Sequence, residues 1–202
     1  MGSSEKFIKM QQLVFATNNA HKLEEVAAKI KGSIQLVSLN DIGCTDDVEE
    51  TGITFSQNAS IKSHYIYSKY HLNCFGDDSG LEIDALSGEP GVYSARYAGK
   101  HGDHAANNQK VLEKLSSTNN RKARFRTVIS LMWNGEEHFF EGVVEGTIRR
   151  ELSGAAGFGY DPIFQPDGYT KTFAEMSLDE KNAISHRAKA MDKLLDFLNR
   201  AN

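Results

Sequence analysis

The sequence has no apolar run close to the roughly 18 residues that a membrane-spanning helix needs. Met1 to Gln12 also lacks the apolar core of a secretory signal peptide. Basic residues are not in excess, because 23 Lys and Arg stand against 27 Asp and Glu, a formal net charge of −4. This balance argues against bulk binding of nucleic acid and gives no reason to expect a membrane surface as a partner.

Cysteine is scarce as well, and Cys44 and Cys74 lack the spacing of a metal site. Reduced thiols and a cytoplasmic location are therefore expected. At 202 residues, 40% of them apolar and 25% charged, the chain can bury a core as one large domain or two small lobes. We expect residues 1–12 to be an N-terminal extension whose Met1-Gly-Ser-Ser start is typical of an added tag, and residues 13–202 to form the domain.

Two adjacent carboxylates, Asp77 and Asp78, follow a short apolar run and precede Ser79-Gly80. Because charged side chains are rarely buried unpaired, a carboxylate doublet at the end of a strand-like run suggests a cation site. The flanking glycines allow a ligand to approach the backbone closely. The alternative is an ordinary polar turn between two strands.

A polar loop, Thr17 to Lys22, lies between an apolar strand-like run at 13–16 and a helical pattern at 23–30. A helix N-terminus beside Lys22 favours a phosphate group. The glycines of a P-loop are absent. Helix capping by Thr17, Asn18 or Asn19 is the structural alternative.

A dense acidic run at 46–52 comes just before a long predicted helix over 54–70. If this helix packs back on the strand that follows it, Glu49 or Glu50 would face Asp78. Two carboxylates, phosphate oxygens and water would then supply the oxygen ligands of Mg²⁺. The alternative is a solvated acidic surface.

The remaining patterns predict helices over 103–115 and 188–199, a strand over 34–39, and a hairpin of strands 125–133 and 137–147. The hairpin turns at Asn134-Gly135, a strong signal for such a turn. Residues 121–126 form the only basic patch, and we interpret it as a solvated edge in preference to a nucleic-acid contact.

A second cluster lies in the last third of the chain. The loop 154–164 mixes small residues with Phe158, Tyr160 and Asp161, so its backbone can approach a ligand while an aromatic ring covers a flat base. A short helix follows, with Ser177 and Glu180 spaced as a capping box. Near it, Lys181 suits a phosphate and Arg187 a phosphate or carbonyl, and His186 can donate or accept a proton near neutral pH.

Six stretches occur in an order and spacing that together are specific. They are Ala16-Thr-Asn-Asn-Ala-His-Lys22, Glu49-Glu-Thr-Gly52, Gly76-Asp-Asp-Ser-Gly-Leu81, Pro90-Gly-Val-Tyr-Ser-Ala-Arg-Tyr97, Gly157-Phe-Gly-Tyr-Asp-Pro162 and Lys181-Asn-Ala-Ile-Ser-His-Arg187. From about Leu13 to Leu198 the chain resembles the non-canonical purine nucleoside triphosphate pyrophosphatases, the inosine triphosphatase family.

The resemblance implies an α/β fold of two lobes around a long, bent mixed β-sheet flanked by helices, with the nucleotide in the cleft between the lobes. It implies Mg²⁺-dependent hydrolysis of ITP, dITP and XTP to the monophosphate and pyrophosphate, and a homodimer. By position, Glu49 and Asp78 bind the metal and Asp78 also accepts a proton. Substrate contacts fall to Thr17, Asn18, Asn19, Ala20, His21, Lys22, Ser79, Phe158, Gly159, Tyr160, Asp161, Lys181, His186 and Arg187.

Two positions depart from the family pattern. Asn18 stands where the family often has Gly, and Ala155-Ala156-Gly157 replaces Gly-Thr-Gly-Gly before the Phe. Neither departure removes a charged catalytic group.

The expected mechanism is metal-assisted attack of water at the α-phosphorus, with Lys22 and Lys181 offsetting charge on the departing pyrophosphate. A carboxylate that ligates the metal is a weak free base, so both Asp78 and Asp77 stay open as the base. The resemblance also implies that His186 and Arg187 read the 6-oxo edge of the purine. The alternatives are a pyrophosphatase for modified pyrimidine nucleotides of the septum-formation type, a phosphatase releasing orthophosphate, and a nucleotide-sensing module without turnover.

Overall fold

The computed structural model describes residues 10–30, 32 and 34–201, so most of the predicted N-terminal extension lies outside the described residues. Three short 3₁₀ helices, at Asp84–Leu86, Gly91–Arg96 and Phe173–Glu175, accompany the main elements. The strands and helices are β1 (Gln11–Phe15), α1 (Ala20–Ala27), β2 (Ile34–Val37), α2 (Phe55–Tyr70), β3 (Cys74–Ile83), α3 (His104–Lys114), β4 (Lys122–Trp133), β5 (Glu136–Ile148), β6 (Phe164–Pro166), α4 (Leu178–Ile184) and α5 (His186–Ala201).

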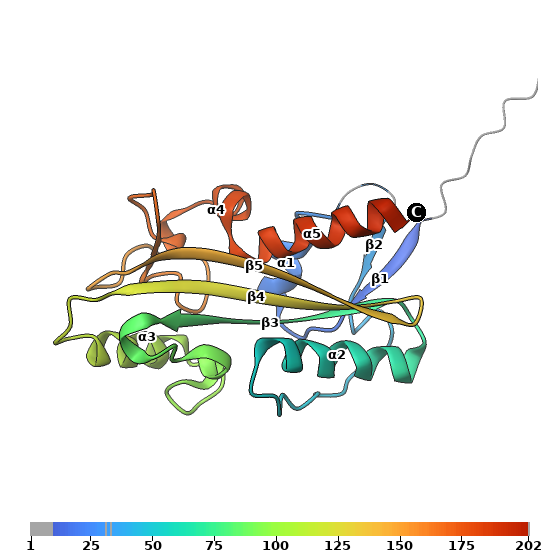
Figure 1. Ribbon diagram of the computed structural model, residues 1–202, viewed down its shortest axis with the longest axis horizontal. Helices are drawn as coiled ribbons and strands as arrows, with labels where there is room; N and C mark the ends of the chain where they lie inside the picture. Colours follow the sequence, from blue (N-terminus) through green and yellow to red (C-terminus); the bar gives the residue numbers. More distant parts are fainter. Residues whose placement is uncertain (1–9, 31, 33, 202) are drawn as a thin grey trace, which may run out of the picture.

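One mixed sheet forms the centre of the molecule, in the order β2-β1-β3-β4-β5-β6. The pairs β1–β2 and β1–β3 are parallel, whereas the remaining pairs are antiparallel. Helices α2 and α3 cover one face of this twisted sheet, and α5, α4 and α1 lie on the other (Figure 1). The architecture is therefore α/β with a long mixed sheet between helices, as the family resemblance implies. Its division into two lobes stays a prediction.

Local signals fix several elements. The hairpin turns at Asn134 and Gly135, which both have positive φ, as a tight two-residue turn requires. Ser177 and Glu180 form the predicted capping box at α4. Two helices differ from their predicted ranges. Helix α1 spans Ala20–Ala27 instead of 23–30, because Asn19 caps it, and α5 spans His186–Ala201 instead of 188–199.

The carboxylate doublet does not end a strand or form a turn, so both sequence interpretations of its setting are wrong. Asp77 and Asp78 lie inside the continuous strand β3, opposite Ile129 and Val128 of β4. The strand continues through them because apolar residues on both sides anchor it and because each carboxylate finds polar partners. Successive strand residues point to opposite faces, so the two carboxylates meet different surroundings.

A notch in the sheet positions the candidate site. Strand β1 pairs with β3 only at Val14–Cys74 and Phe15–Phe75. The chain then leaves the sheet after Ala16, whose N–H donates to the carbonyl of Phe75. Strand β3 continues beyond this point while β1 does not. The loop after β1 is thereby placed beside the middle of β3.

Apolar side chains fill both sides of the sheet. Phe15 and Phe75 stack with ring centroids 4.3 Å apart beneath the core of α5, which includes Met191 and Leu194. Ile66 belongs to a separate cluster under α2. Burying these side chains provides the main driving force for folding.

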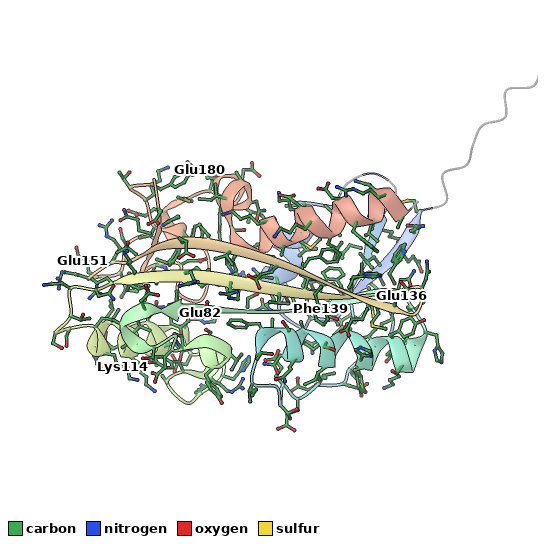
Figure 2. All side chains as sticks on the ribbon, viewed as in Figure 1. Glu82, Lys114, Glu136, Phe139, Glu151 and Glu180 are labelled. Atoms are coloured by element: carbon green, nitrogen blue, oxygen red, sulfur yellow. The ribbon has the colours of Figure 1, made fainter. Side chains whose placement is uncertain are left out.

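Charged side chains cover the outside of the molecule. Glu136 and Phe139 lie at the hairpin end of the long sheet, whereas Glu151 lies at its other end (Figure 2). Lys189 and Lys193 of α5 donate to the carbonyls of Val143 and Glu141. On this edge of β5, pairing with β6 is confined to Gly146, Thr147 and Ile148 within the described residues, so the two lysines cover backbone acceptors that lie outside the pairing.

The basic patch at 121–126 is only partly a solvated edge. The prediction is wrong for Arg121, which is buried and donates to the carbonyls of Leu115, Ile148 and Arg149. Arg126 forms ion pairs with Glu82 of β3 and with a carboxylate of β5. Within the described residues, no helix combines the length and the apolar composition needed to cross a membrane.

Candidate active site

A cavity of about 390 Å³ opens at the notch between β1 and β3. Among the predicted site residues, the following line it: Thr17, Asn18, Asn19, Lys22, Asp78, Ser79, Phe158, Gly159, Tyr160, Asp161, Lys181, His186 and Arg187. Ala20, His21 and Glu49 do not. Glu49 is exposed, whereas its neighbour Glu50 is part of the lining. Segments far apart in the sequence therefore meet in one pocket.

The loop after β1 is held by its own side chains. The amide N–H of Asn19 donates to the hydroxyl of Thr17 over 3.2 Å. The side chain of Asn19 accepts from the amides of His21 and Lys22, at 3.0 and 3.3 Å. Capping is thus confirmed for Asn19, and it occupies two of the amide donors that a phosphate would otherwise use at this helix N-terminus. A phosphate group in this pocket would therefore have to be bound mainly by charged side chains.

Two lysines, Lys22 and Lys62, line the end of the pocket that also holds Asp78 and Glu50. The ammonium of Lys22 lies 2.8 Å from Asp77, and its side chain is only 15% exposed. Burial lowers the pKa of Lys22 below 10.5, although the charge of Asp77 opposes this shift.

Asp77 is paired on two sides. Besides Lys22, it accepts from Nε of Arg187 at 3.2 Å and from the hydroxyl of Ser79 at 3.1 Å. Burial alone would raise the pKa of Asp77, but Lys22 and Arg187 hold it well below the usual range of a carboxyl. A carboxylate held in the ionised form by two cations is a poor proton acceptor. Asp77 therefore acts as a structural anchor.

Asp78 has the opposite character. It accepts from the amide side chain of Asn58 at 2.9 Å and from the backbone N–H of Ser79 at 2.8 Å. Burial raises the pKa of Asp78, and the charge of Glu50 adds to this effect while Lys62 opposes it. Of the two carboxylates, Asp78 is the one that lines the cavity.

Lys62 and Glu50 complete the charged end of the pocket, with their charged atoms 2.5 Å apart. Sequence reasoning did not single out Lys62. The signal was present, because this lysine lies on the stripe of α2 that also holds buried Ala59 and Ile66. A lysine on the buried stripe of a helix needs a polar partner.

The donor set suits Mg²⁺ better than a metal held by protein alone. Within the part of the chain that the structure describes, no group of three or more His, Cys, Asp or Glu side chains is placed to hold a metal ion. Asp78 and Glu50 line the same cavity, and each raises the cost of charging the other. A divalent cation bound to both would relieve that repulsion. Mg²⁺ typically takes one or two carboxylates and completes its shell with phosphate oxygens and water.

The opposite end of the pocket is aromatic. The ring of Phe158 stacks on His21, with centroids 5.1 Å apart and planes 8° from parallel. The ammonium of Lys181 lies 4.9 Å from the centroid of the same ring. His21 thus contacts the loop that carries Phe158 with its side chain and does not line the cavity, although the resemblance places it with the triphosphate.

The loop that carries Phe158 is firmly built. Its amide donates to Asp161 over 2.8 Å, and the carbonyl of Gly159 accepts from Asn108 of α3 over 2.8 Å. At Gly157, φ is +75° and an added Cβ would lie 2.2 Å from Asp161. Only glycine fits there. The hydroxyl of Tyr160 donates to the carbonyl of Ser94, so this ring packs inward.

The start of α5 places His186 and Arg187. A Cβ on Gly142 of β5 would lie 2.0 Å from the carbonyl oxygen of His186, so glycine is what lets the helix approach this strand. The imidazole stacks on Phe125, with centroids 4.7 Å apart. Burial and the nearby Arg187 charge keep the pKa of His186 well below 6.5. The ring is therefore neutral at pH 7, with one nitrogen donating and one accepting.

Six charged side chains form one continuous series of contacts along the pocket. Three carboxylates alternate with three cations, so the series is neutral as a whole. Within it, Glu25 of α1 bonds both Arg187 and Lys181, the latter at 2.6 Å. The series runs Lys22, Asp77, Arg187, Glu25, Lys181, Asp161.

Comparison with known proteins gives consistent relatives. A sequence model described as the Ham1 family matches residues 13–197. The dITP/XTP pyrophosphatase of Porphyromonas gingivalis is 52% identical, over 94% of this chain and 98% of that protein. The protein of the same name from Christiangramia forsetii is 49% identical, over 94% and 100%.

Solved structures agree with the sequence relatives. The Ham1 protein of Staphylococcus aureus superimposes with a TM-score of 0.87 at 40% identity, covering 95% of this chain and all of that one. A HAM1 protein from Coxiella burnetii gives the same TM-score at 42% identity, with the same coverage.

Proposed function

Because this chain belongs to the Ham1 family, we propose that it hydrolyses the non-canonical purine nucleoside triphosphates ITP, dITP and XTP to the monophosphate and pyrophosphate. Such an activity removes these nucleotides from the cellular pool. Relatives that are about half identical over nearly the whole chain carry the name dITP/XTP pyrophosphatase. One structural observation carries the assignment best. The pocket has lysines beside carboxylates at one end, and an aromatic ring with His186 and Arg187 at the other.

A nucleoside triphosphate has the matching polarity. Its phosphates suit the end with Lys22 and Lys62, and the purine suits the end with Phe158. Lys181 was expected to offset charge on pyrophosphate. It lies against Phe158 instead, so Lys62 takes that place in the proposal.

We assign Mg²⁺ to Asp78 together with a glutamate of the acidic run. The resemblance gives Glu49 as this second ligand. The structure favours Glu50, because Glu50 lines the pocket whereas Glu49 is exposed and does not line it. When bound, Mg²⁺ polarises phosphate oxygens and lowers the pKa of a coordinated water.

The chain's own residues orient the reactants. Lys22 and Lys62 lie where they offset the charge of the departing pyrophosphate. Asp78 receives the proton of the attacking water in this proposal, because the ion pairs of Asp77 make that carboxylate the poorer acceptor of the two. A metal-ligating carboxylate is a weak base, but a weak base suffices where the pKa of the water would be lowered by a bound metal.

Selectivity for the base follows from hydrogen bonding. A neutral His186 can donate to a 6-oxo group, and the 6-amino group of adenine leaves that donor unpaired. Guanine also carries a 6-oxo group, so its rejection must depend on contacts around position 2.

A product assay tests the proposal. Purified protein is incubated with ITP, XTP, GTP, ATP and a modified pyrimidine triphosphate, with and without Mg²⁺, and monophosphate, pyrophosphate and orthophosphate are quantified. The expected result is Mg²⁺-dependent pyrophosphate from ITP and XTP, with little product from ATP. Orthophosphate as the product would indicate a phosphatase, and a preference for the pyrimidine would indicate a pyrophosphatase for modified pyrimidine nucleotides. Tight ITP binding without turnover would indicate a nucleotide-sensing module.

Two further proposals concern the setting of the protein. We propose a homodimer, which the resemblance implies and which exposed apolar side chains such as Tyr93 and Ile53 support. Sedimentation equilibrium would then give about twice the 22.4 kDa of the chain. A cytoplasmic location is proposed because both cysteines are free thiols.

A further inference from the structure

Glu25 is a buried carboxylate that does not line the pocket. It lies in the second half of α1, and only 4% of its surface is exposed. One carboxylate oxygen accepts from the ammonium of Lys181 at 2.6 Å, and the other accepts from Nη1 of Arg187. Burial alone would raise the pKa of Glu25, but the two cations lower it to about 2. Its negative charge is therefore permanent at physiological pH.

Both partners of Glu25 face the base end of the pocket. The ammonium of Lys181 lies 4.9 Å and the guanidinium carbon of Arg187 5.9 Å from the centroid of the Phe158 ring. Arg187 also reaches toward the middle of the pocket, where it contacts Ser79 and Asp77.

With Glu25 in place, the charges of Lys181 and Arg187 are balanced by Glu25 and Asp161, and Arg187 also pairs with Asp77, which it shares with Lys22. Without Glu25, the three cations of this series would meet only two carboxylates, so the base end would carry an excess positive charge.

The charge balance at the other end differs. The two lysines there, Lys22 and Lys62, meet three carboxylates. These are Asp77, Asp78 and Glu50, so a bound Mg²⁺ would turn the net charge of this end positive. A triphosphate is attracted wherever positive charge is in excess. A neutral base end therefore leaves the phosphates one favourable place to bind.

We propose that Glu25 is a positioning residue that fixes Lys181 and Arg187 for purine recognition and cancels their charge, so that phosphate groups bind only at the Lys22 end. This inference rests on the proposed function, since it assigns a role within the same pocket. It predicts two opposite effects of neutralising Glu25. Purine selectivity falls, while binding of a polyphosphate that has no base becomes tighter.

The test uses the variant Glu25→Gln, with inorganic tripolyphosphate as the baseless probe. Calorimetric titration without Mg²⁺ should show tripolyphosphate binding about fivefold tighter or more than in wild type, as expected for one added charge near an anion. The ratio of kcat/KM for ITP over ATP should fall about tenfold. Glu24→Gln, an exposed neighbour on the same helix, is the matched control and should change neither value.

A merely structural role predicts a different pattern. Loosening of the pocket would weaken tripolyphosphate binding together with ITP turnover, and that result would overturn the proposal. So would an unchanged ITP-to-ATP ratio in a variant that folds. If no variant and no wild-type protein hydrolyses ITP, the proposed function fails, while the tripolyphosphate titration still decides on the charge effect.

A second variant covers the case in which Glu25→Gln does not fold. The double variant Glu25→Gln with Lys181→Met removes one anion and one cation, so the base end is neutral again. Its tripolyphosphate affinity should match wild type while its ITP-to-ATP ratio stays low. A wild-type ratio in this variant would contradict the positioning role.

Discussion

Asp77 and Asp78 are neighbours in sequence with unlike chemistry, because they face opposite sides of β3. Asp77 meets Lys22 and Arg187, whereas Asp78 meets Asn58 and the cavity. The doublet is visible in the sequence, but the division of labour is not. It depends on which helices cover each face of the sheet.

For Asp78, the substitution Asp78→Asn keeps shape and removes the charge. We expect pyrophosphate release from ITP to fall about 10²–10⁴-fold, the usual range for a lost acid–base group. The melting temperature should hold or rise, because a buried carboxylate with a raised pKa is costly to ionise. Near-normal turnover would show that Asp78 takes no part in the reaction. The control is Asp84→Asn, which removes the charge of an exposed aspartate just after β3.

Asp77→Asn should act mainly on stability. It leaves Lys22 and Arg187 without their shared partner in a buried setting, which costs about 3 kcal/mol of unfolding free energy. Urea denaturation measures this loss. A stability equal to that of wild type would show that the ion pairs of Asp77 are dispensable.

His186→Phe tests base recognition and pH dependence together. The ring stays stacked on Phe125 but loses its donor, so kcat/KM for ITP should fall about tenfold while that for ATP holds. An equal loss on both substrates would exclude a role in reading the base.

The pH effect has a defined sign. His186 is buried neutral, with a folded pKa well below its unfolded value of 6.5. The unfolded chain therefore binds the extra proton, and wild-type stability falls as the pH drops below 6.5. His186→Phe should lack this part of the acid sensitivity. A parallel decline of both proteins between pH 6.5 and 5 would contradict the assignment.

Among the elements, those with local chemical signals are predictable from sequence. The Asn134-Gly135 hairpin and the Ser177 capping box are confirmed because their determinants lie within a few residues. Lys62 and Glu25 escaped prediction for the opposite reason. Their partners are 12 to 162 residues away, and only the packing of helices onto the sheet brings them together.

The approach of α5 to β5 gives a prediction at this scale. Gly142→Ala places a methyl group against the backbone of His186, so the helix must shift. We expect a loss of about 1–3 kcal/mol in unfolding free energy together with a raised KM for ITP. Thr147→Ala, on the exposed face of the same strand, is the control for strand propensity. An unaltered KM would separate the position of α5 from substrate recognition.

Over the whole molecule, the sheet determines where the pocket forms. Strand β1 ends after pairing with the first two residues of β3, and the vacated edge receives the loop from Thr17 to Lys22 and the start of α5. The order of most elements follows from the sequence patterns, and the mixed sheet follows from the family resemblance. The short β1–β3 pairing does not follow from strand patterns, because register depends on long-range packing.

The most direct test of the account follows the oxygen atom of the attacking water. ITP is hydrolysed with Mg²⁺ in water enriched in oxygen-18, and the oxygen-18 content of each product is measured by mass spectrometry. Attack at the α-phosphorus predicts one labelled oxygen in IMP and none in pyrophosphate. Label in pyrophosphate, or release of labelled orthophosphate from ITP, would contradict the proposed reaction.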